Sequence, residues 1–431
     1  METISCDRNM AFEKGRSLWR GNIGVMMLTS GIWTFSGQMT WTFWALYVLH
    51  LGGGYFHIGL LSAIGSLFGI LPALLGGYLA DTIGRKRMVY SMSLILSANA
   101  LIYFAAPSWH WLIMAIAIDA VTSGLRGPAF NAIIADSTNA ESRAESYALT
   151  HIVPPLFGIL SPYLIGVYMD RLGVVPAQRG AYLILFITSL TASLMRFKFL
   201  RETLPTKVRG RVRVSRVLGE TFSGMKETAK VMPRQLWVLT VMGILFGFGA
   251  SVGNPFWVTY ATEDVIRLSN AQWGLILTSN MIISTVVSLP FAQLADQKGR
   301  LKLVLPSMLL NPLVIVAFIY SRSFLQAFAV GVAATILSSM SASASQALFT
   351  DHSTRNHRGR INALLSVIGT MQTFTMGGMA GSLLGACGNL LGGFLYGNLS
   401  KASPLLLQAG MAAAAAIVGL LFLKEPKRRA E

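Results

Sequence analysis

The chain has 431 residues, of which 53% are hydrophobic and only 12% are charged, and its mean hydropathy is +0.56. Because soluble domains carry about 25% charged residues, this composition excludes an ordinary soluble globular protein. The net charge of +17 does not indicate nucleic-acid binding, because the basic residues lie in short clusters between apolar runs that can cross a bilayer.

Twelve apolar segments follow one another along the chain. In the first half they lie at residues 22–49, 56–80, 88–106, 109–135, 146–169 and 180–199. In the second half they lie at residues 235–261, 271–295, 303–320, 323–350, 361–398 and 402–423. We predict that each is a membrane-spanning helix, because an open strand would leave its backbone N–H and C=O groups unpaired in lipid.

The eleventh segment differs from the others in its length and its glycine content. A continuous helix over the run from Ile361 to Ser400 would reach ~58 Å, well beyond the thickness of a bilayer. We therefore expect a break or an extramembrane extension near residues 377–389, GGMAGSLLGACGN.

Lys and Arg residues are concentrated at one end of the predicted helices. Of the 35 basic residues, 29 fall in the two tails and in the loops on the same side, and the region from Arg196 to Arg234 alone holds 11. The positive-inside rule places these regions in the cytoplasm. We predict a multi-pass protein of the cell membrane with both termini cytoplasmic.

The two halves of the chain repeat one another. The stretch from Gly77 to Arg87, GYLADTIGRKR, returns as FAQLADQKGRLK from Phe291 to Lys302. One constant spacing, close to half the length of the chain and here called the repeat spacing, separates the pairs Gly59/Gly274, Leu79/Leu294, Asp81/Asp296, Gly84/Gly299, Arg85/Arg300 and Asp136/Asp351. We predict one six-helix bundle at residues 1–200, a cytoplasmic linker at 201–234 and a second six-helix bundle at 235–431.

The repeated motif has residues suited to a tight junction of helix ends. Gly77 allows a second helix to approach, Gly84 permits a tight turn, and Arg85 can reach a neighbouring carboxylate. A loop that merely orients the chain would explain Arg85 but not the repeated acids, Asp81 and Asp296. We interpret the motif as part of a gate.

Two homologous six-helix halves, a basic central connector and G-x-L-A-D-x-x-G-R-K between the second and third helices together resemble the major facilitator superfamily. The matching residues of the first copy are Gly77, Leu79, Ala80, Asp81, Gly84, Arg85 and Lys86. The second copy, which begins at Phe291, departs from the motif: it has no glycine at the position of Gly77, and Leu301 replaces the second base. The resemblance implies an all-α integral membrane protein of twelve helices in two pseudo-symmetric bundles.

The resemblance also implies how the motif acts. Arg85 would pair with Asp136, and Asp81 would face the N-terminus of the eleventh helix, whose dipole favours an anion. The cytoplasmic gate would then comprise Gly77, Asp81, Gly84, Arg85, Asp136, Asp296, Gly299, Arg300 and Asp351.

Two charged residues, Asp119 and Arg126, are expected inside the membrane, both in the fourth segment. Each would cost ~2.5 to 3.5 kcal/mol at the centre of a bare helix. Their spacing of seven places them on one helix face, on the order of 10 Å apart. We predict that Asp119 binds a proton or a cation, and that Arg126 tunes the pKa of Asp119 or holds a substrate anion.

The alternative for this pair is a water-bridged contact that fixes helix packing. Arg126 resembles the fourth-helix arginine linked with proton coupling in drug-efflux members of the family. The R-x-x-Q-G that surrounds that arginine is absent here, where residues 126–129 read RGPA.

Candidates for the substrate pathway are polar or aromatic residues of the first, seventh and tenth segments: Gln38, Trp41, Asn254, Trp257, Ser339 and Ser343. The tryptophans could instead belong to an interfacial belt. The serines could be small packing residues.

No nucleophile–base–acid set, nucleotide-binding loop or metal cluster is recognisable, so we predict no enzyme, cofactor or metal. The sequence predicts a monomeric secondary active transporter that works by alternating access, similar to the drug:proton antiporters of multidrug efflux. It would couple proton movement to export of a small apolar or amphipathic compound, because one acid in an aromatic pathway suits such a substrate. A symporter that imports a small organic solute, a lipid-moving protein and a receptor remain alternatives.

Overall fold

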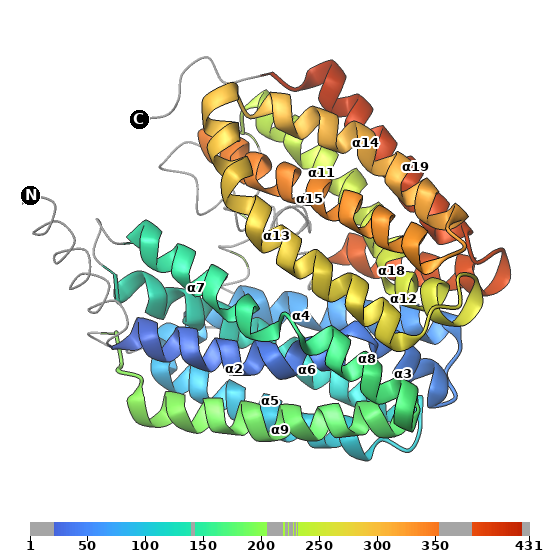
Figure 1. The fold of residues 1–431 in the computed structure, drawn as a ribbon. Helices are drawn as coiled ribbons and strands as arrows, with labels where there is room; N and C mark the ends of the chain where they lie inside the picture. Colours follow the sequence, from blue (N-terminus) through green and yellow to red (C-terminus); the bar gives the residue numbers. More distant parts are fainter. Residues whose placement is uncertain are drawn as a thin grey trace, which may run out of the picture.

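The computed structural model describes residues 21–138, 143–204, 232–352 and 382–424, and four single positions between 205 and 231. Every regular element in these ranges is a helix, and no strand occurs among them (Figure 1). Within them, ten helices are long and apolar enough to cross a membrane. The predicted all-helical membrane fold is therefore confirmed, whereas the count of twelve spans stays a prediction.

The first half of the chain, α2 to α9, follows the predicted segments closely. Its helices are α2 (Asn22–Thr42), α3 (Trp44–His50), α4 (Tyr55–Ile83), α5 (Arg85–Ala105), α6 (Trp109–Asp136), α7 (Arg143–Gly158), α8 (Ser161–Leu172) and α9 (Val174–Phe199).

The second half, α11 to α19, begins with a helix that changes its winding. This run consists of α11 (Arg234–Gly253), the 3₁₀ turn η1 (Asn254–Phe256), α12 (Trp257–Thr259) and the π-helical turn η2 (Tyr260–Asp264). The helices that follow are α13 (Asn270–Lys298), α14 (Leu301–Tyr320), α15 (Phe324–His352), α18 (Leu383–Asn398) and α19 (Ser403–Phe422). Of the stretch 377–389 in which a break is predicted, residues 377–381 lie outside the described residues, and α18 begins within the rest of it, at Leu383, after Ser382 with an extended backbone (φ −130°, ψ 143°).

Three predicted segments differ from the observed helices. The first is divided at Phe43, whose φ of −115° and ψ of 21° separate α2 from α3. The fifth is divided into α7 and α8, with Pro162 in the first turn of α8. The sixth begins at Val174 rather than at residue 180, after Gly173 with φ +85°. Pro176 is compatible with that first turn, where backbone N–H groups have no helical partner anyway.

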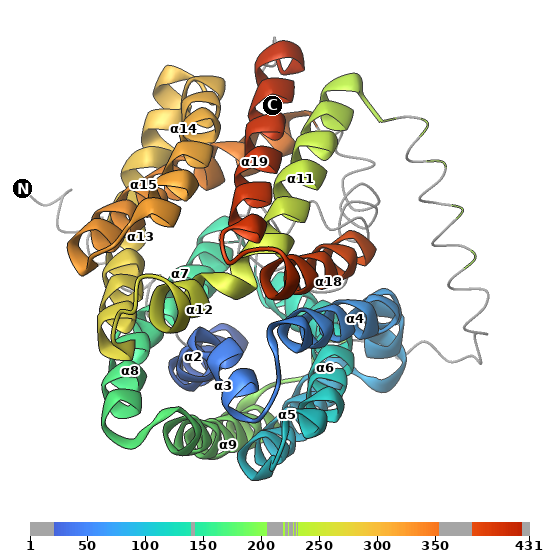
Figure 2. The same ribbon diagram turned by 90° about the vertical axis from the view of Figure 1, so that its right-hand side faces the viewer.

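The two halves lie as separate groups of helices that approach each other on one side (Figure 1). Figure 2 shows α18 beside α4 and α13 beside α8, and these are the main contacts between the halves. The residue boundaries of the two predicted bundles stay a prediction.

Two glycines of the repeat lie at these contacts. A Cβ on Gly59 of α4 would overlap the carbonyl oxygen of Asn389 and lie 3.1 Å from Cα of Gly393, both in α18. A Cβ on Gly274 of α13 would overlap the carbonyl oxygen of Pro162 in α8. Both glycines allow the backbones of the two halves to come into contact. The repeat in the sequence is therefore also a repeat in the structure: at each of the two positions, a helix of one half crosses a helix of the other.

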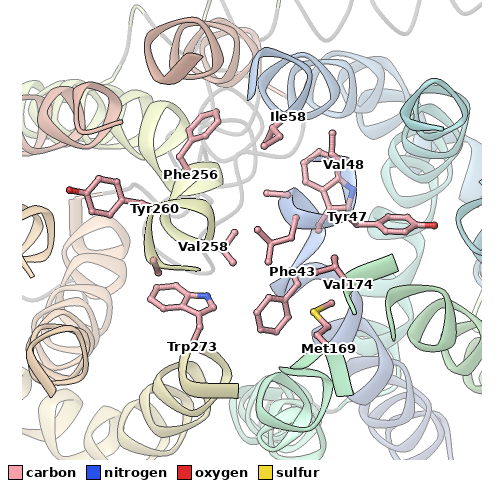
Figure 3. Close-up of a cluster of buried hydrophobic side chains, with 14 of the residues drawn as sticks. Phe43, Tyr47, Val48, Ile58, Met169, Val174, Phe256, Val258, Tyr260 and Trp273 are labelled. Carbon is pink, nitrogen blue, oxygen red and sulfur yellow. The ribbon is translucent and has the colours of Figure 1, made fainter. Parts of the chain in front are cut away.

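The hydrophobic core differs between the two ends of the molecule. At the end where the helices turn at Leu51, Ala106 and Gly173, here called the far end, one cluster combines residues of both halves (Figure 3). At the opposite end, here called the motif end and marked by Gly84 and Gly299, each half has its own cluster. The halves are therefore joined through a shared core at the far end.

Candidate functional site

A cavity of two adjoining lobes lies between the halves. The first lobe has a volume of about 400 Å³ and the second about 490 Å³. Both are lined by Trp41, Trp44, Ser62, Asn254 and Pro255. Each lobe is large enough for a drug-sized compound, because ligand pockets typically measure ~300 to 1,000 Å³.

Asp119 is the one charged side chain among the described residues that line the two lobes. It lies in the wall of the first lobe, and α5 supplies its partners. Asn99 Nδ2 donates to Asp119 Oδ1 at 2.7 Å, and the Tyr103 hydroxyl donates to Oδ2 at 2.8 Å. The Asn99 amide also donates to the carbonyl of Ala115 at 2.8 Å. These bonds fix the carboxylate in one orientation.

A set of stacked tyrosines supports this carboxylate. The rings of Tyr103 and Tyr182 are stacked, with centroids 4.7 Å apart and planes 7° apart. The Tyr47 hydroxyl donates to the backbone carbonyl of Tyr103 at 2.7 Å. All three side chains are buried. Packing therefore limits the movement of the hydroxyl that holds Asp119.

Arg126, the second predicted coupling residue, does not line either lobe in the described part of the chain. Its guanidinium lies over the ring of Trp33 in α2, 5.6 Å from the centroid, a cation–π geometry. Within the described ranges, no carboxylate lies at ion-pair distance from it. The structure thus gives Arg126 an aromatic partner and places Asp119 in the cavity.

Arg196 is a buried charged residue that is not among the predicted intramembrane charges, Asp119 and Arg126. It lies in α9, is 2% exposed, and donates to the hydroxyls of Thr29 at 3.0 Å and Ser93 at 2.8 Å. Its guanidinium is also 5.7 Å from the ring centroid of Phe130. In the sequence Arg196 looks like the first residue of the basic region that ends at Arg234, and its hydroxyl partners on α2 and α5 become neighbours only in the fold.

Five aromatic side chains line the second lobe: Trp41, Trp44, Trp257, Trp273 and Phe318. The Trp257 ring stacks on Phe318 at 4.3 Å, and its Nε1 donates to Gln408 Oε1 at 3.0 Å. Gln408 Nε2 in turn donates to Asn254 Oδ1 at 3.0 Å. Gln408 is not among the predicted residues, although a glutamine within an apolar segment is a signal that it has a polar partner.

The predicted pathway residues fall into three groups. Trp41 and Asn254 line both lobes, and Trp257 lines the second. Gln38 and Ser339 are not among the described lining residues. A Cβ on Gly158 of α7 would lie 3.0 Å from Cγ of Gln38, and the Ser339 hydroxyl donates to Ser284 Oγ at 3.2 Å. The side chain of Ser343 lies outside the described residues.

The repeated motif forms a junction of three helix ends in the first half. Gly84, with φ +109°, ends α4, and Arg85 begins α5. Arg85 Nη1 pairs with the carboxylate of Asp136 at the end of α6, and its Nε lies 3.2 Å from Asp81 Oδ1. Gly77 lies one turn before Asp81, and its nearest neighbour atom for a Cβ is Pro128 Cβ at 3.9 Å.

The second copy of the motif has the same local geometry. Gly299 has φ +95°, and Arg300 Nη2 lies 3.7 Å from Asp296 Oδ1. The Asp351 side chain lies outside the described residues, as does the beginning of the eleventh segment that Asp81 would face. The observed pairs lie within single halves, so the predicted gate contact between the halves is not tested.

The described residues contain no group of three or more His, Cys, Asp or Glu side chains placed to hold a metal ion. The chemistry available at the cavity is therefore that of Asp119, of amide and hydroxyl groups, and of aromatic faces.

Comparison with known proteins gives one family and several relatives. Residues 26–262 and 239–431 match the family model described as Major Facilitator Superfamily. A Na(+), Li(+), K(+)/H(+) antiporter from Planococcus maritimus is 29% identical over 154 residues, which is 32% of this chain and 36% of that protein. An uncharacterised MFS-type transporter of Bacillus subtilis (strain 168), YqjV, is 23% identical over 269 residues, 60% of this chain and 61% of its own length. Both matches span less than two thirds of the relative.

Among solved structures, that of a POT family transporter in complex with 5-aminolevulinic acid superimposes with a TM-score of 0.71. The sequence identity is 13%, and the match covers 93% of this chain and 95% of that chain. At this identity, the likeness shows a shared fold over nearly the whole chain.

Proposed function

The chain belongs to the major facilitator superfamily and is a multi-pass membrane transporter, and we propose that it exports a small apolar or amphipathic compound in exchange for protons. The observation that carries this proposal is Asp119, the one charge among the described residues of a cavity otherwise lined by aromatic, apolar and neutral polar side chains. The transporter would act as a monomer in the cell membrane, with both termini in the cytoplasm.

The exchange follows from competition for the cavity. When the far end is open, Asp119 takes up a proton and the bound compound leaves. When the motif end is open, Asp119 releases the proton and a new compound binds against the tryptophans. Coupling requires that the cavity never carries the proton and the compound across the membrane at the same time. The arrangement observed supports the loading step, because the described residues of the two halves share a core only at the far end.

The motif junction provides the gate of this proposal at the cytoplasmic side. Asp81, Arg85 and Asp136 hold three helix ends together in the first half, and Asp296 with Arg300 makes the corresponding contact in the second. A rigid junction would present Asp81 to the start of the eleventh helix whenever the halves close at this end.

Arg85→Ala should shift the population towards the form that is open at the motif end. The substitution removes the cation that holds both Asp81 and Asp136, so the helix ends lose their fixed arrangement. Labelling of cysteines introduced at the cytoplasmic side should become faster than in the parent protein, whereas Lys86→Ala should label at the parental rate. Unchanged accessibility in Arg85→Ala would count against the gate.

The exchange can be tested in everted membrane vesicles that are acidified inside and loaded with a pH-reporting dye. Amphipathic compounds such as ethidium, sugars and amino acids are added outside in turn. An antiporter should release protons when its compound is added, and vesicles without the protein should not respond. If the compound instead moved in the same direction as the protons, the protein would be a symporter.

A second candidate is exchange of Na⁺, Li⁺ or K⁺ for protons. It is favoured by the 29% identical antiporter from Planococcus maritimus and by the Asp119 carboxylate in the cavity wall, since oxygen ligands suit hard cations. In the same vesicles, proton release on addition of NaCl, LiCl or KCl, with no response to organic compounds, would establish this candidate in place of the first.

A further inference from the structure

Two polar contacts cross between the halves at the far end, away from the cavity and from the repeated motif. The first connects the end of α8 in the first half with the start of α13 in the second half. Asp170 Oδ1 accepts hydrogen bonds from the backbone N–H of Asn270 at 2.9 Å and from its Nδ2 at 3.0 Å. Asp170 Oδ2 accepts one from the backbone N–H of Ala271 at 2.9 Å.

This contact uses the chemistry of a helix start. The first N–H groups of α13 have no partner within the helix, and the N-terminus of a helix attracts negative charge. A carboxylate of one half therefore satisfies backbone donors of the other. The bonds can form only while α8 and α13 are in contact.

The second contact connects η2 and α18 of the second half with the start of α4 in the first. Asp264 Oδ1 accepts a hydrogen bond from the Tyr55 hydroxyl at 2.6 Å, and Oδ2 accepts one from the Tyr396 hydroxyl at 2.8 Å. Lys401 Nζ lies 3.6 Å from Asp264 Oδ1 and 3.4 Å from the centroid of the Tyr55 ring. Tyr55 is thus bound at its hydroxyl and at its ring face by the second half.

The two contacts occupy equivalent places in the repeat. Tyr55 and Asn270 are separated by the repeat spacing, and each is the first residue of its helix. Gly59 and Gly274, one turn later, make the two backbone crossings between the halves. Asp170 of the first half holds the helix start of the second, and Asp264 of the second half holds that of the first. The contacts are therefore reciprocal.

We propose that Asp170 and Asp264 are gating residues, which together form a two-point latch that holds the far end closed during transport. Both carboxylates would be hydrated when the halves separate, so the latch exchanges bonds within the protein for bonds to water and can open reversibly. Because the bonds exist only in the closed arrangement, they bias the equilibrium towards it. This inference rests on alternating access in the proposed function, but not on the coupling ion or the direction of transport.

The latch can be tested by the distance between spin labels on either side of the far end. Trp111 at the start of α6 and Leu325 at the start of α15 have exposed side chains and lie outside both contacts. The spin labels would be attached to cysteines introduced as Trp111→Cys and Leu325→Cys, in a protein whose own cysteines are removed by Cys6→Ser and Cys387→Ser. The distance between the labels would be measured by pulsed dipolar spectroscopy on the full protein in liposomes. The measurement needs no substrate, so a failure of the export proposal would not affect it.

The variants are Asp170→Asn, Asp264→Asn and their combination, which keep the shape of each side chain and remove its charge. In the double variant we expect the ratio of the long-distance to the short-distance population to be at least about tenfold higher than in the parent protein. The reason is that charge-assisted hydrogen bonds are stronger than neutral ones. Arg171→Gln and Glu263→Gln alter charges next to the two acids in sequence and should leave the distances unchanged.

Tyr55→Phe provides a milder variant in case the double variant does not fold, because it removes a single hydroxyl and keeps the ring. It should give a smaller shift in the same direction. Distances identical to those of the parent in both the folded double variant and Tyr55→Phe would overturn the latch.

Discussion

Asp119→Asn should abolish transport driven by a pH gradient while the protein remains folded and still binds its compound. Asparagine has nearly the same shape and can accept from Asn99 or Tyr103, but it cannot take up a proton. In the acidified vesicles, the compound that releases protons with the parent protein should give the response of vesicles without the protein. Binding can be followed by the thermal shift that the compound produces.

Two matched variants distinguish loss of the proton site from general damage to the cavity. Ser123→Ala changes another residue that lines the first lobe and should retain proton release. Tyr103→Phe removes one of the two bonds to Asp119 and should alter the pH dependence without abolishing transport. Full pH-gradient-driven transport by Asp119→Asn would show that the coupling role of this residue is wrong.

Gly59→Ala and Gly274→Ala, combined in one chain, should prevent the far end from closing. Each added methyl group would overlap a backbone carbonyl of the other half, and a backbone cannot yield as a flexible side chain can. Overpacking of this kind costs about 1 to 3 kcal/mol per site, which corresponds to a shift of about 5- to 150-fold in a two-state equilibrium. Exchange should fall accordingly, and the distance between labels at residues 111 and 325 should lengthen.

Two other glycines give the control for this variant. A Cβ on Gly127 or on Gly410 would meet no atom within 4 Å, so Gly127→Ala and Gly410→Ala should leave both the exchange rate and the distance unchanged. Parental distances in the combined Gly59→Ala, Gly274→Ala variant would contradict the close crossing between the halves.

The helices can be predicted from sequence because hydropathy and charge are local properties. Most observed ends lie within a few residues of the predicted ones, as for α6, predicted at 109–135 and observed at Trp109–Asp136. The division at Phe43 cannot be predicted, because no proline or glycine marks it and packing decides the conformation there. The predicted start of α9 lies too late because Gln178 and Arg179 interrupt the apolar pattern. In the structure Gln178 donates to the carbonyl of Thr40, and Arg179 to that of Ala106.

The candidate site can be predicted only in part. Asp119 is conspicuous as an acid in an apolar segment, but its partners Asn99 and Tyr103 lie on another helix and become neighbours only in the fold. The repeat spacing is easily recognised in the charged motif near Arg85. The same spacing between Tyr55 and Asn270 involves no charge and gives no signal in the sequence, although both residues make polar contacts between the halves at the far end.

Proton release from acidified vesicles, measured side by side for the parent protein and for Asp119→Asn, is the decisive measurement for proton-coupled export through Asp119. We expect an apolar or amphipathic compound to release protons through the parent protein, and we expect no such response from the folded variant. A parent protein that accumulates the compound in the compartment that protons enter, or a variant that exchanges at the parental rate, would contradict this expectation.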